Sequence, residues 1–187
     1  LMGAEIVFIA RNPVKANELN KTLKSLTGKE STSIIADLSS QLEVKRAADK
    51  FLSLNKPLHI LLNNAGIMNT SRKETVDGLE EVFSVNHLAY YSLTLLLMDK
   101  LIANGPSRIV NVASGAHMFI KEMNFDDLQS EKEYKTMRVY GQSKLANILF
   151  TRELSEKLEG KGITVNCLHP GFVNTGIGSN NSPTLGR

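Results

Sequence analysis

The chain has 187 residues, of which 42% are hydrophobic and 22% are charged, and its formal net charge is +3. This composition is typical of a globular domain with a substantial core, and we expect residues 1–187 to form a single domain. Lys and Arg are scattered along the sequence, which argues against a nucleic-acid partner. The only cysteine, Cys167, cannot form an intrachain disulfide, and this favours a cytoplasmic location.

Short apolar runs alternate with helical patterns along the chain. In order, we expect a strand at 5–10, a helix at 14–26, a strand at 32–36, a helix at 41–54, a strand at 58–62, a helix at 79–103, a strand at 108–113, a helix at 132–159 and a strand at 163–168. Strands that alternate with helices pair in parallel, and continuous apolar strands are usually covered on both faces. The sequence therefore predicts an α/β fold, a doubly wound parallel sheet in three αβα layers.

Polar or glycine-bearing residues follow every predicted strand. They are Arg11, Asp37, the run Asn63-Asn64-Ala65-Gly66, Ser114 and the pair Pro170-Gly171. The carboxyl ends of parallel strands meet at one edge of the sheet, which is where such folds bind ligands. Five strand ends of this kind indicate a binding site at that edge.

Tyr140 and Lys144 are four residues apart on a predicted helix, so they share one face of it. A nearby ammonium group favours the phenolate, and we therefore expect Lys144 to lower the pKa of Tyr140. A phenol tuned in this way can give a proton to a carbonyl oxygen or take one from an alcohol. Ser114 would hydrogen-bond the same oxygen.

Several motifs follow one another in a fixed order along the chain: Asp37, Asn63-Asn64-Ala65-Gly66, Asn86, Ser114, Tyr140-x-x-x-Lys144 and Pro170-Gly171. This ordered set resembles the short-chain dehydrogenase/reductase family over essentially the whole chain. The runs 125–132 and 143–154, and the wide separation of Ser114 and Tyr140, resemble its retinol-dehydrogenase-like branch. The resemblance implies a Rossmann-like, nicotinamide-dependent oxidoreductase with Asn86, Ser114, Tyr140 and Lys144 as catalytic residues. It implies that Lys144 also binds the nicotinamide ribose, and that Asn86 holds a water that relays protons to Lys144.

The same resemblance implies the cofactor site. Its residues would be Arg11, Asp37, Leu38, Asn63, Asn64, Ala65, Gly66, Tyr140, Lys144, Pro170, Gly171, Val173 and Thr175. Arg11 follows the first predicted strand at the position where an acidic residue would favour NAD. A guanidinium there can pair with a 2′-phosphate, so we expect NADP(H). Arg11 could instead be a solvated turn residue.

Each of these residues also has a plain structural explanation. Tyr140 and Lys144 could be a packed aromatic and a solvated charge, Ser114 a turn residue and Asn86 a packing residue. Asn63 and Asn64 are common in turns after strands. We expect Cys167 to be inert core, and the four histidines have no metal-ligand spacing, so no metal is expected.

The sequence departs from the family pattern at both ends. It contains no glycine-rich turn of the kind that holds a diphosphate at a helix N-terminus. We expect the chain to lack a first βα unit, on the order of 30 residues, and a C-terminal strand and helix. The chain would then be a fragment of a longer protein. The missing first strand lies centrally in the family, so its absence should leave two inner strand edges unpaired.

The function expected from these features is NADP(H)-dependent interconversion of a carbonyl and an alcohol on a small lipophilic substrate, such as a retinoid, a steroid or a lipid aldehyde. The alternative is an inactive remnant or interaction module of the same fold. A sugar-nucleotide epimerase is less favoured. The resemblance implies a homodimer that pairs through the helices at 79–103 and 132–159. Membrane association is expected only through a missing N-terminal segment, which would place the protein at a cytosol-facing membrane surface.

Overall fold

The computed structural model describes residues 3–171. Its parallel strands are β1 (Val7–Ala10), β2 (Thr32–Ile35), β3 (Ile60–Asn63), β4 (Ser107–Val112) and β5 (Ile163–Leu168). The α-helices are α1 (Pro13–Thr27), α2 (Gln41–Ser53), α3 (Glu81–Phe83), α4 (Ala89–Leu96), α5 (Met98–Ala103) and α6 (Thr136–Lys157). A π-helix, η1 (Ser84–Leu88), and two 3₁₀ helices, η2 (Gly115–Phe119) and η3 (Phe125–Asp127), complete the elements of the described part.

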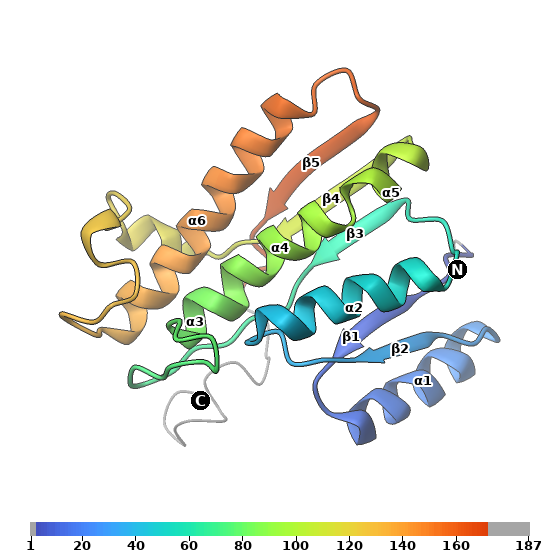
Figure 1. Cartoon of the computed structure of the whole chain (residues 1–187), viewed down its shortest axis with the longest axis horizontal. Coiled ribbons are helices and arrows are strands. Elements are labelled where there is room, and N and C mark those ends of the chain that lie inside the picture. Colours follow the sequence, from blue (N-terminus) through green and yellow to red (C-terminus); the bar gives the residue numbers. More distant parts are fainter. Residues whose placement is uncertain (1–2, 172–187) are drawn as a thin grey trace.

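The strands form two parallel sheets in place of one continuous sheet (Figure 1). One sheet pairs β1 with β2, with Val7 opposite Thr32, and the other has the order β3-β4-β5. Among the described residues, β1 bonds only to β2 and β3 only to β4, so each has one unpaired inner edge. The predicted pair of unpaired edges is therefore confirmed for this part of the chain.

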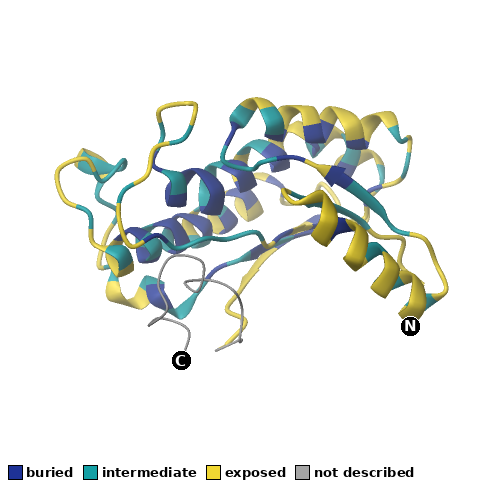
Figure 2. Cartoon of the chain, turned by 90° about the horizontal axis from the view of Figure 1, so that it is seen from below, coloured by how far each residue is buried: buried dark blue, intermediate teal, exposed yellow. Residues whose placement is uncertain are grey.

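Helices cover the two sheets differently. Figure 2 shows α1 and α2 on opposite faces of the β1–β2 pair, which gives three layers there. The helices α4 and α6 lie together on one face of the larger sheet (Figure 1). On β3 the side chains of Ile60 and Leu62 are 61% and 57% exposed, while Leu61 between them is buried. The expectation that both faces of every strand are covered is therefore wrong for β3 within the described residues.

The single helix expected at 79–103 is interrupted. The buried Glu80 caps its start, because its carboxylate accepts hydrogen bonds from the amides of Val82 and Phe83. The amide of Ala89 then bonds to the carbonyl of Ser84, five residues back, which makes the π turn η1. Leu97 separates α4 from α5. The expected helix at 132–159 is shorter at its start and begins at Thr136.

One hydrophobic core joins the two sheets. Buried residues of α2, such as Val44 and Phe51, pack with Ile34 of β2 and Leu61 of β3. Helix α2 therefore bridges the space between the sheets. In the described part of the chain no helix has the length and apolarity that a membrane span requires.

Candidate active site

Helix α6 carries Tyr140 and Lys144 toward the carboxyl end of β4. Lys144 is 2% exposed, and its Nζ donates a hydrogen bond of 3.0 Å to the carbonyl of Val112, the last residue of β4. The same Nζ lies 5.7 Å from the centre of the Tyr140 ring and 5.6 Å from that of Tyr90. Lys144 is therefore a buried cation, and the plain reading of it as a solvated charge is wrong.

Burial changes the acidity of both residues. It lowers the pKa of Lys144 to about 8, because the charged form loses its water. It also raises the pKa of Tyr140, and the hydrogen bond with the Ser114 side chain offsets this only in part. The expectation that Lys144 lowers the pKa of Tyr140 is wrong for this structure. The ammonium faces the ring and bonds to the Val112 carbonyl, so it does not counter the cost of burying the phenolate.

Ser114 lies beyond β4 and begins the 3₁₀ helix η2. Its Oγ accepts a hydrogen bond of 3.2 Å from the amide of Ala116, and its side chain also bonds Tyr140. The close approach of η2 to α6 depends on Gly141, a residue that the sequence analysis did not single out. A Cβ at Gly141 would lie 2.8 Å from the carbonyl oxygen of Ala116 and from a side-chain carbon of Ile120. A glycine inside a helical pattern was the available signal for this contact.

Asn86 lies in the π turn and is completely buried. Its side chain accepts a hydrogen bond from the amide of Ile67 at 2.8 Å and donates to the carbonyl of Ile67 and to Ser143 Oγ, both at 3.0 Å. Its backbone carbonyl accepts a bond of 2.8 Å from Asn147, another residue that the sequence analysis did not single out. Asn86 thus fixes the segment after β3 against α6.

The segment Asn63–Gly66 begins with a buried residue that has a structural role and continues with residues that solvent can reach. Asn63 is buried, and its Nδ2 donates to Asn111 Oδ1 at 2.8 Å and to Thr94 Oγ1 at 3.0 Å, which ties β3 to β4 and α4. Asn64 is exposed. A Cβ at Gly66 would lie 3.5 Å from Lys144 Nζ, so the backbone of this segment passes directly beside the buried ammonium.

Arg11 and Asp37 lie beside each other at the ends of β1 and β2. Their side chains form an ion pair of 3.8 Å, in which Arg11 is 68% exposed. Asp37 Oδ1 also accepts a hydrogen bond from the amide of Ser39, and Leu38 is half-buried between them. An exposed guanidinium at a strand end is available to an anion, and the structure is consistent with both readings of Arg11.

The end of β5 approaches η2. His169 Nδ1 accepts a hydrogen bond of 3.2 Å from the amide of Gly115, and Pro170 and Gly171 follow it in exposed positions. Val173 and Thr175 lie outside the described residues. Cys167 in β5 is exposed, so the expectation of an inert core cysteine is wrong.

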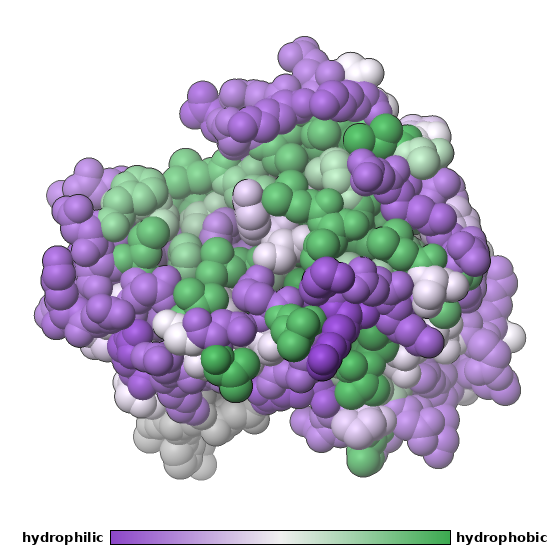
Figure 3. Space-filling model, viewed as in Figure 1, coloured by the Kyte–Doolittle hydropathy of each residue, from purple (hydrophilic) through white to green (hydrophobic). Residues whose placement is uncertain are grey.

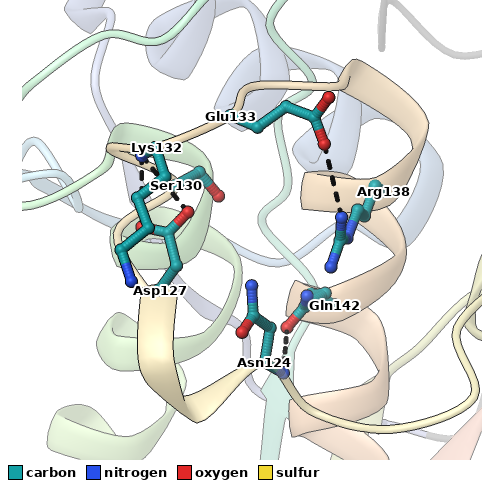
Figure 4. Close-up of a pocket in the computed structure, with 7 residues that line it drawn as sticks. All are labelled: Asn124, Asp127, Ser130, Lys132, Glu133, Arg138 and Gln142. Atoms are coloured by element: carbon teal, nitrogen blue, oxygen red, sulfur yellow. Dashed lines mark hydrogen bonds and ion pairs between the residues drawn. The ribbon is translucent and has the colours of Figure 1, made fainter.

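A separate polar cavity of about 230 Å³ lies between α6 and the segment that precedes it (Figure 4). Its lining residues are Asn124, Asp127, Ser130, Lys132, Glu133, Arg138 and Gln142. Arg138 pairs with Glu133 at 3.5 Å, and Gln142 accepts a bond from the amide of Asn124. Arg138 and Gln142 share a helix face, from which Tyr140 points away. This cavity is therefore distinct from the space around Tyr140.

The side chains at the strand ends fit parts of a dinucleotide. A buried ammonium, a phenol and a hydroxyl converge at Lys144, Tyr140 and Ser114, and Arg11 offers an exposed guanidinium at the far strands. No described strand carries a glycine-rich turn that would receive the diphosphate. In the described ranges no three His, Cys, Asp or Glu residues are grouped so that they could hold a metal ion.

Comparisons with known proteins agree with this geometry. The model of the short chain dehydrogenase family matches residues 1–186. Mouse retinol dehydrogenase 12 is 42% identical over 173 residues, which are 91% of this chain and 54% of that protein. Human retinol dehydrogenase 14 is 47% identical over 142 residues, 76% of this chain and 42% of that protein. The chain thus spans about half the length of the curated relatives it matches.

The comparison with solved structures agrees with the sequence comparison. The Pseudomonas aeruginosa RhlG/NADP active-site complex is 27% identical, with a TM-score of 0.73 over 91% of this chain and 64% of that one. A short-chain dehydrogenase from Sphingobium yanoikuyae in complex with NADPH has a TM-score of 0.77 at 24% identity, over 99% of this chain and 69% of that one, and shows the common fold. By sequence match, fold and arrangement of the strand-end residues, the chain belongs to the short-chain dehydrogenase family, with retinol-dehydrogenase-like relatives.

Proposed function

We propose that this chain carries the proton-transfer site of an oxidoreductase that uses NADP(H) to interconvert a carbonyl and an alcohol on a small lipophilic substrate. The observation that supports this proposal best is the convergence of Tyr140, Ser114 and the buried Lys144 at the end of β4. A buried cation without a carboxylate partner costs free energy, and such groups are concentrated at functional sites.

In the proposed reaction Tyr140 is the general acid for carbonyl reduction and the general base for alcohol oxidation. The bound nicotinamide supplies or accepts the hydride at the substrate carbon. The phenol gives its proton to the carbonyl oxygen, and Ser114 donates a hydrogen bond that holds this oxygen in line. Because burial raises the pKa of Tyr140, the phenol is protonated at neutral pH and ready for reduction.

Lys144 would bind the nicotinamide ribose, and Asn86 would hold the water that returns a proton to Lys144. The backbone carbonyl of Asn86 accepts a bond of 2.8 Å from Asn147, and a carbonyl oxygen has two lone pairs. This carbonyl is the acceptor that we propose for the water. The adenosine end would lie against Arg11, Asp37, Leu38 and the exposed part of Asn63–Gly66, with Pro170, Gly171, Val173 and Thr175 completing the site.

The choice of NADP(H) over NAD rests on Arg11. It is exposed at the end of β1 and can bond a 2′-phosphate, whereas its ion pair with Asp37 is long, at 3.8 Å, and therefore weak. The relatives solved with NADP or NADPH support the same choice. The lipophilic substrate class rests on the retinol dehydrogenase relatives.

Replacement of Tyr140 by phenylalanine tests its proposed role as the general acid and base. We expect Tyr140→Phe to reduce turnover of retinoid and simple aldehydes by roughly 10²–10⁴-fold, the usual contribution of general acid catalysis. Affinity for NADPH, measured by its fluorescence during titration with protein, should stay nearly unchanged. Retained turnover in this variant would refute the assignment.

The competing proposal is a module of the same fold without catalysis. It is favoured by the two separate sheets and by the lack of a diphosphate-binding turn among the described residues. The same NADPH titration separates the two proposals. No binding at millimolar cofactor favours the non-catalytic module for this chain, whereas binding that weakens in Arg11→Ala favours the oxidoreductase and its NADP(H) preference.

The proposal includes two further points. The protein forms a homodimer, and it is located in the cytosol. An apolar surface, defined by Leu95, Leu96, Ile102 and Leu149, covers the outer side of α4, α5 and α6 (Figure 3). Exposed apolar surface of this kind is typical of protein interfaces. A cytosolic setting would keep the exposed thiol of Cys167 reduced.

A further inference from the structure

Tyr90 connects two parts of the site that are far apart in the sequence. It lies on α4 and is 2% exposed. Its hydroxyl donates a hydrogen bond of 2.7 Å to the carbonyl of Ala65, and its ring faces Lys144 Nζ at 5.6 Å. One side chain therefore contacts both the buried ammonium and the backbone of the segment after β3.

The helix geometry explains this placement. Tyr90 and Asn86 are four residues apart, so they project on the same side of the chain. Asn86 holds both backbone groups of Ile67, and Tyr90 holds the carbonyl of Ala65. Gly66 lies between these anchored residues, close to Lys144 Nζ. The backbone beside the ammonium is thus fixed on either side of Gly66, by Asn86 of η1 and by Tyr90 of α4.

The ammonium of Lys144 lacks a carboxylate partner. Among the ion pairs of the described residues none includes Lys144, and its bonded partner there is the neutral carbonyl of Val112. The rings of Tyr90 and Tyr140 supply the remaining contacts. The negative face of an aromatic ring attracts a cation, and the effect grows when both are desolvated.

We propose that Tyr90 is a positioning residue whose ring stabilises the charged form of Lys144 and whose hydroxyl fixes the Ala65–Gly66 backbone beside it. Its consequence for turnover rests on the proposed oxidoreductase function, but both contacts can be measured without activity. The ring and the hydroxyl have separate roles, so different substitutions should affect them separately.

The other titratable groups near Lys144 are accounted for. Tyr140 faces the ammonium from its own helix, and burial keeps both phenols neutral by raising the pKa of Tyr90 and of Tyr140. His87 follows Asn86 in the π turn but bonds to Asn147 Oδ1 at 3.0 Å, and burial lowers its pKa. Neither the two phenols nor the imidazole carries a charge near neutrality. The contact with the Tyr90 ring is therefore the main stabilisation that α4 offers to the charged form of Lys144.

The ring is tested by measuring the pKa of Lys144 directly. The full chain is labelled with ¹³C at lysine Cε, the signal is assigned by its loss in Lys144→Met, and its shift is followed with pH. In Tyr90→Leu we expect the pKa of Lys144 to fall by about 0.5 to 1.5, which corresponds to a cation–π contact of the usual strength. Tyr90→Phe keeps the ring and should leave this pKa unchanged.

The hydroxyl is tested by hydrogen exchange. In Tyr90→Phe the amide of Gly66, whose peptide bond includes the Ala65 carbonyl, should exchange several-fold faster than in the unmodified chain. Tyr91 is the matched control, since it neighbours Tyr90 on the same helix but is 45% exposed. Neither Tyr91→Leu nor Tyr91→Phe should change the Lys144 pKa or the Gly66 exchange.

Two results would overturn the proposal. An unchanged Lys144 pKa in Tyr90→Leu removes the role of the ring, and an unchanged Gly66 exchange in Tyr90→Phe removes the role of the hydroxyl. Tyr90→Met supplies a second ring-free side chain if the leucine variant does not fold. If these shifts occur while no aldehyde is turned over, the proposed function fails and the positioning role stands.

Discussion

At the scale of single residues, the main departure from the sequence-based expectation concerns acidity. The spacing of Tyr140 and Lys144 predicts a shared helix face, and the structure places both side chains at one site. Helical spacing contains no information about burial, however, and burial sets both pKa shifts here. The sequence therefore predicted that Tyr140 and Lys144 share a site, but it assigned the wrong direction to the pKa of Tyr140.

The buried charge of Lys144 should make the stability of the chain depend on pH. The pKa of Lys144 is about 8 in the folded chain, against 10.5 for a lysine fully exposed to water. Below pH 8 both states are protonated and the folded state bears the full cost of burial. As the pH rises from about 8 to 10.5 the folded state releases its proton first, so the contribution of this group to stability increases with pH.

Lys144→Met removes this cost. Its gain in the free energy of unfolding over the unmodified chain should be larger near pH 7 than near pH 10 by about 2–3 kcal/mol, because pH 10 lies roughly two units above the Lys144 pKa of about 8. Urea unfolding at the two pH values measures it. Lys157→Met, at an exposed lysine of the same helix, is the control. An equal effect of Lys144→Met at both pH values would contradict the buried charge.

At the scale of elements, strands and helices were predicted well where the apolar pattern is strong. The segment 79–103 was predicted as one helix because apolar spacing does not distinguish an α-turn from a π turn. The interruption arises from side-chain contacts with distant parts of the chain, such as Asn86 with Ile67 and Ser143. Tyr90, Gly141 and Asn147 were missed for the same reason, since their roles depend on tertiary neighbours.

The β1–β2 pair should be the less stable of the two sheets. Within residues 3–171 it has two strands, and its inner edge at β1 is unpaired, whereas β4 is bonded on both sides. A two-stranded sheet is marginal without packing from a helix, which here comes mainly from α2. Amides of β1 and β2 should therefore exchange with solvent faster than those of β4 under native conditions. Hydrogen exchange with mass spectrometry measures this, and equal protection of both sheets would show that they open as one unit.

At the scale of the whole molecule, the family fold was predicted from the order of the strand-end residues, and the sequence and structure comparisons confirm it. The separation of the described strands into two sheets agrees with the two unpaired inner edges predicted from the sequence. The exposed face of β3 was not, because a continuous apolar run does not reveal which of its side chains lack a covering layer. The single domain over residues 1–187 and the roles of the individual site residues stay predictions.

Self-association is also a property of the whole molecule. If the apolar surface of α4, α5 and α6 joins two copies, Leu95→Lys combined with Leu149→Lys should convert a dimer to a monomer, because each buried lysine would lose its hydration. Sedimentation velocity over a range of concentrations gives the outcome. Val76→Lys, at a residue that is 87% exposed outside these helices, should leave the association state unchanged. A chain that is monomeric before substitution contradicts the proposed pairing.

The π turn at Ser84–Leu88 lets this segment hold one residue more than an α-turn without changing the direction of the helix on either side. Five residues of a π turn complete about the same rotation as four residues of an α-turn. Loss of one residue there would therefore restore an α-turn and leave Glu80 and Tyr90 on their present faces. It would remove the wider turn from which Asn86 bonds to Ile67 and Ser143. A variant that lacks one residue at this point should keep the helix but lose this anchor on the segment after β3.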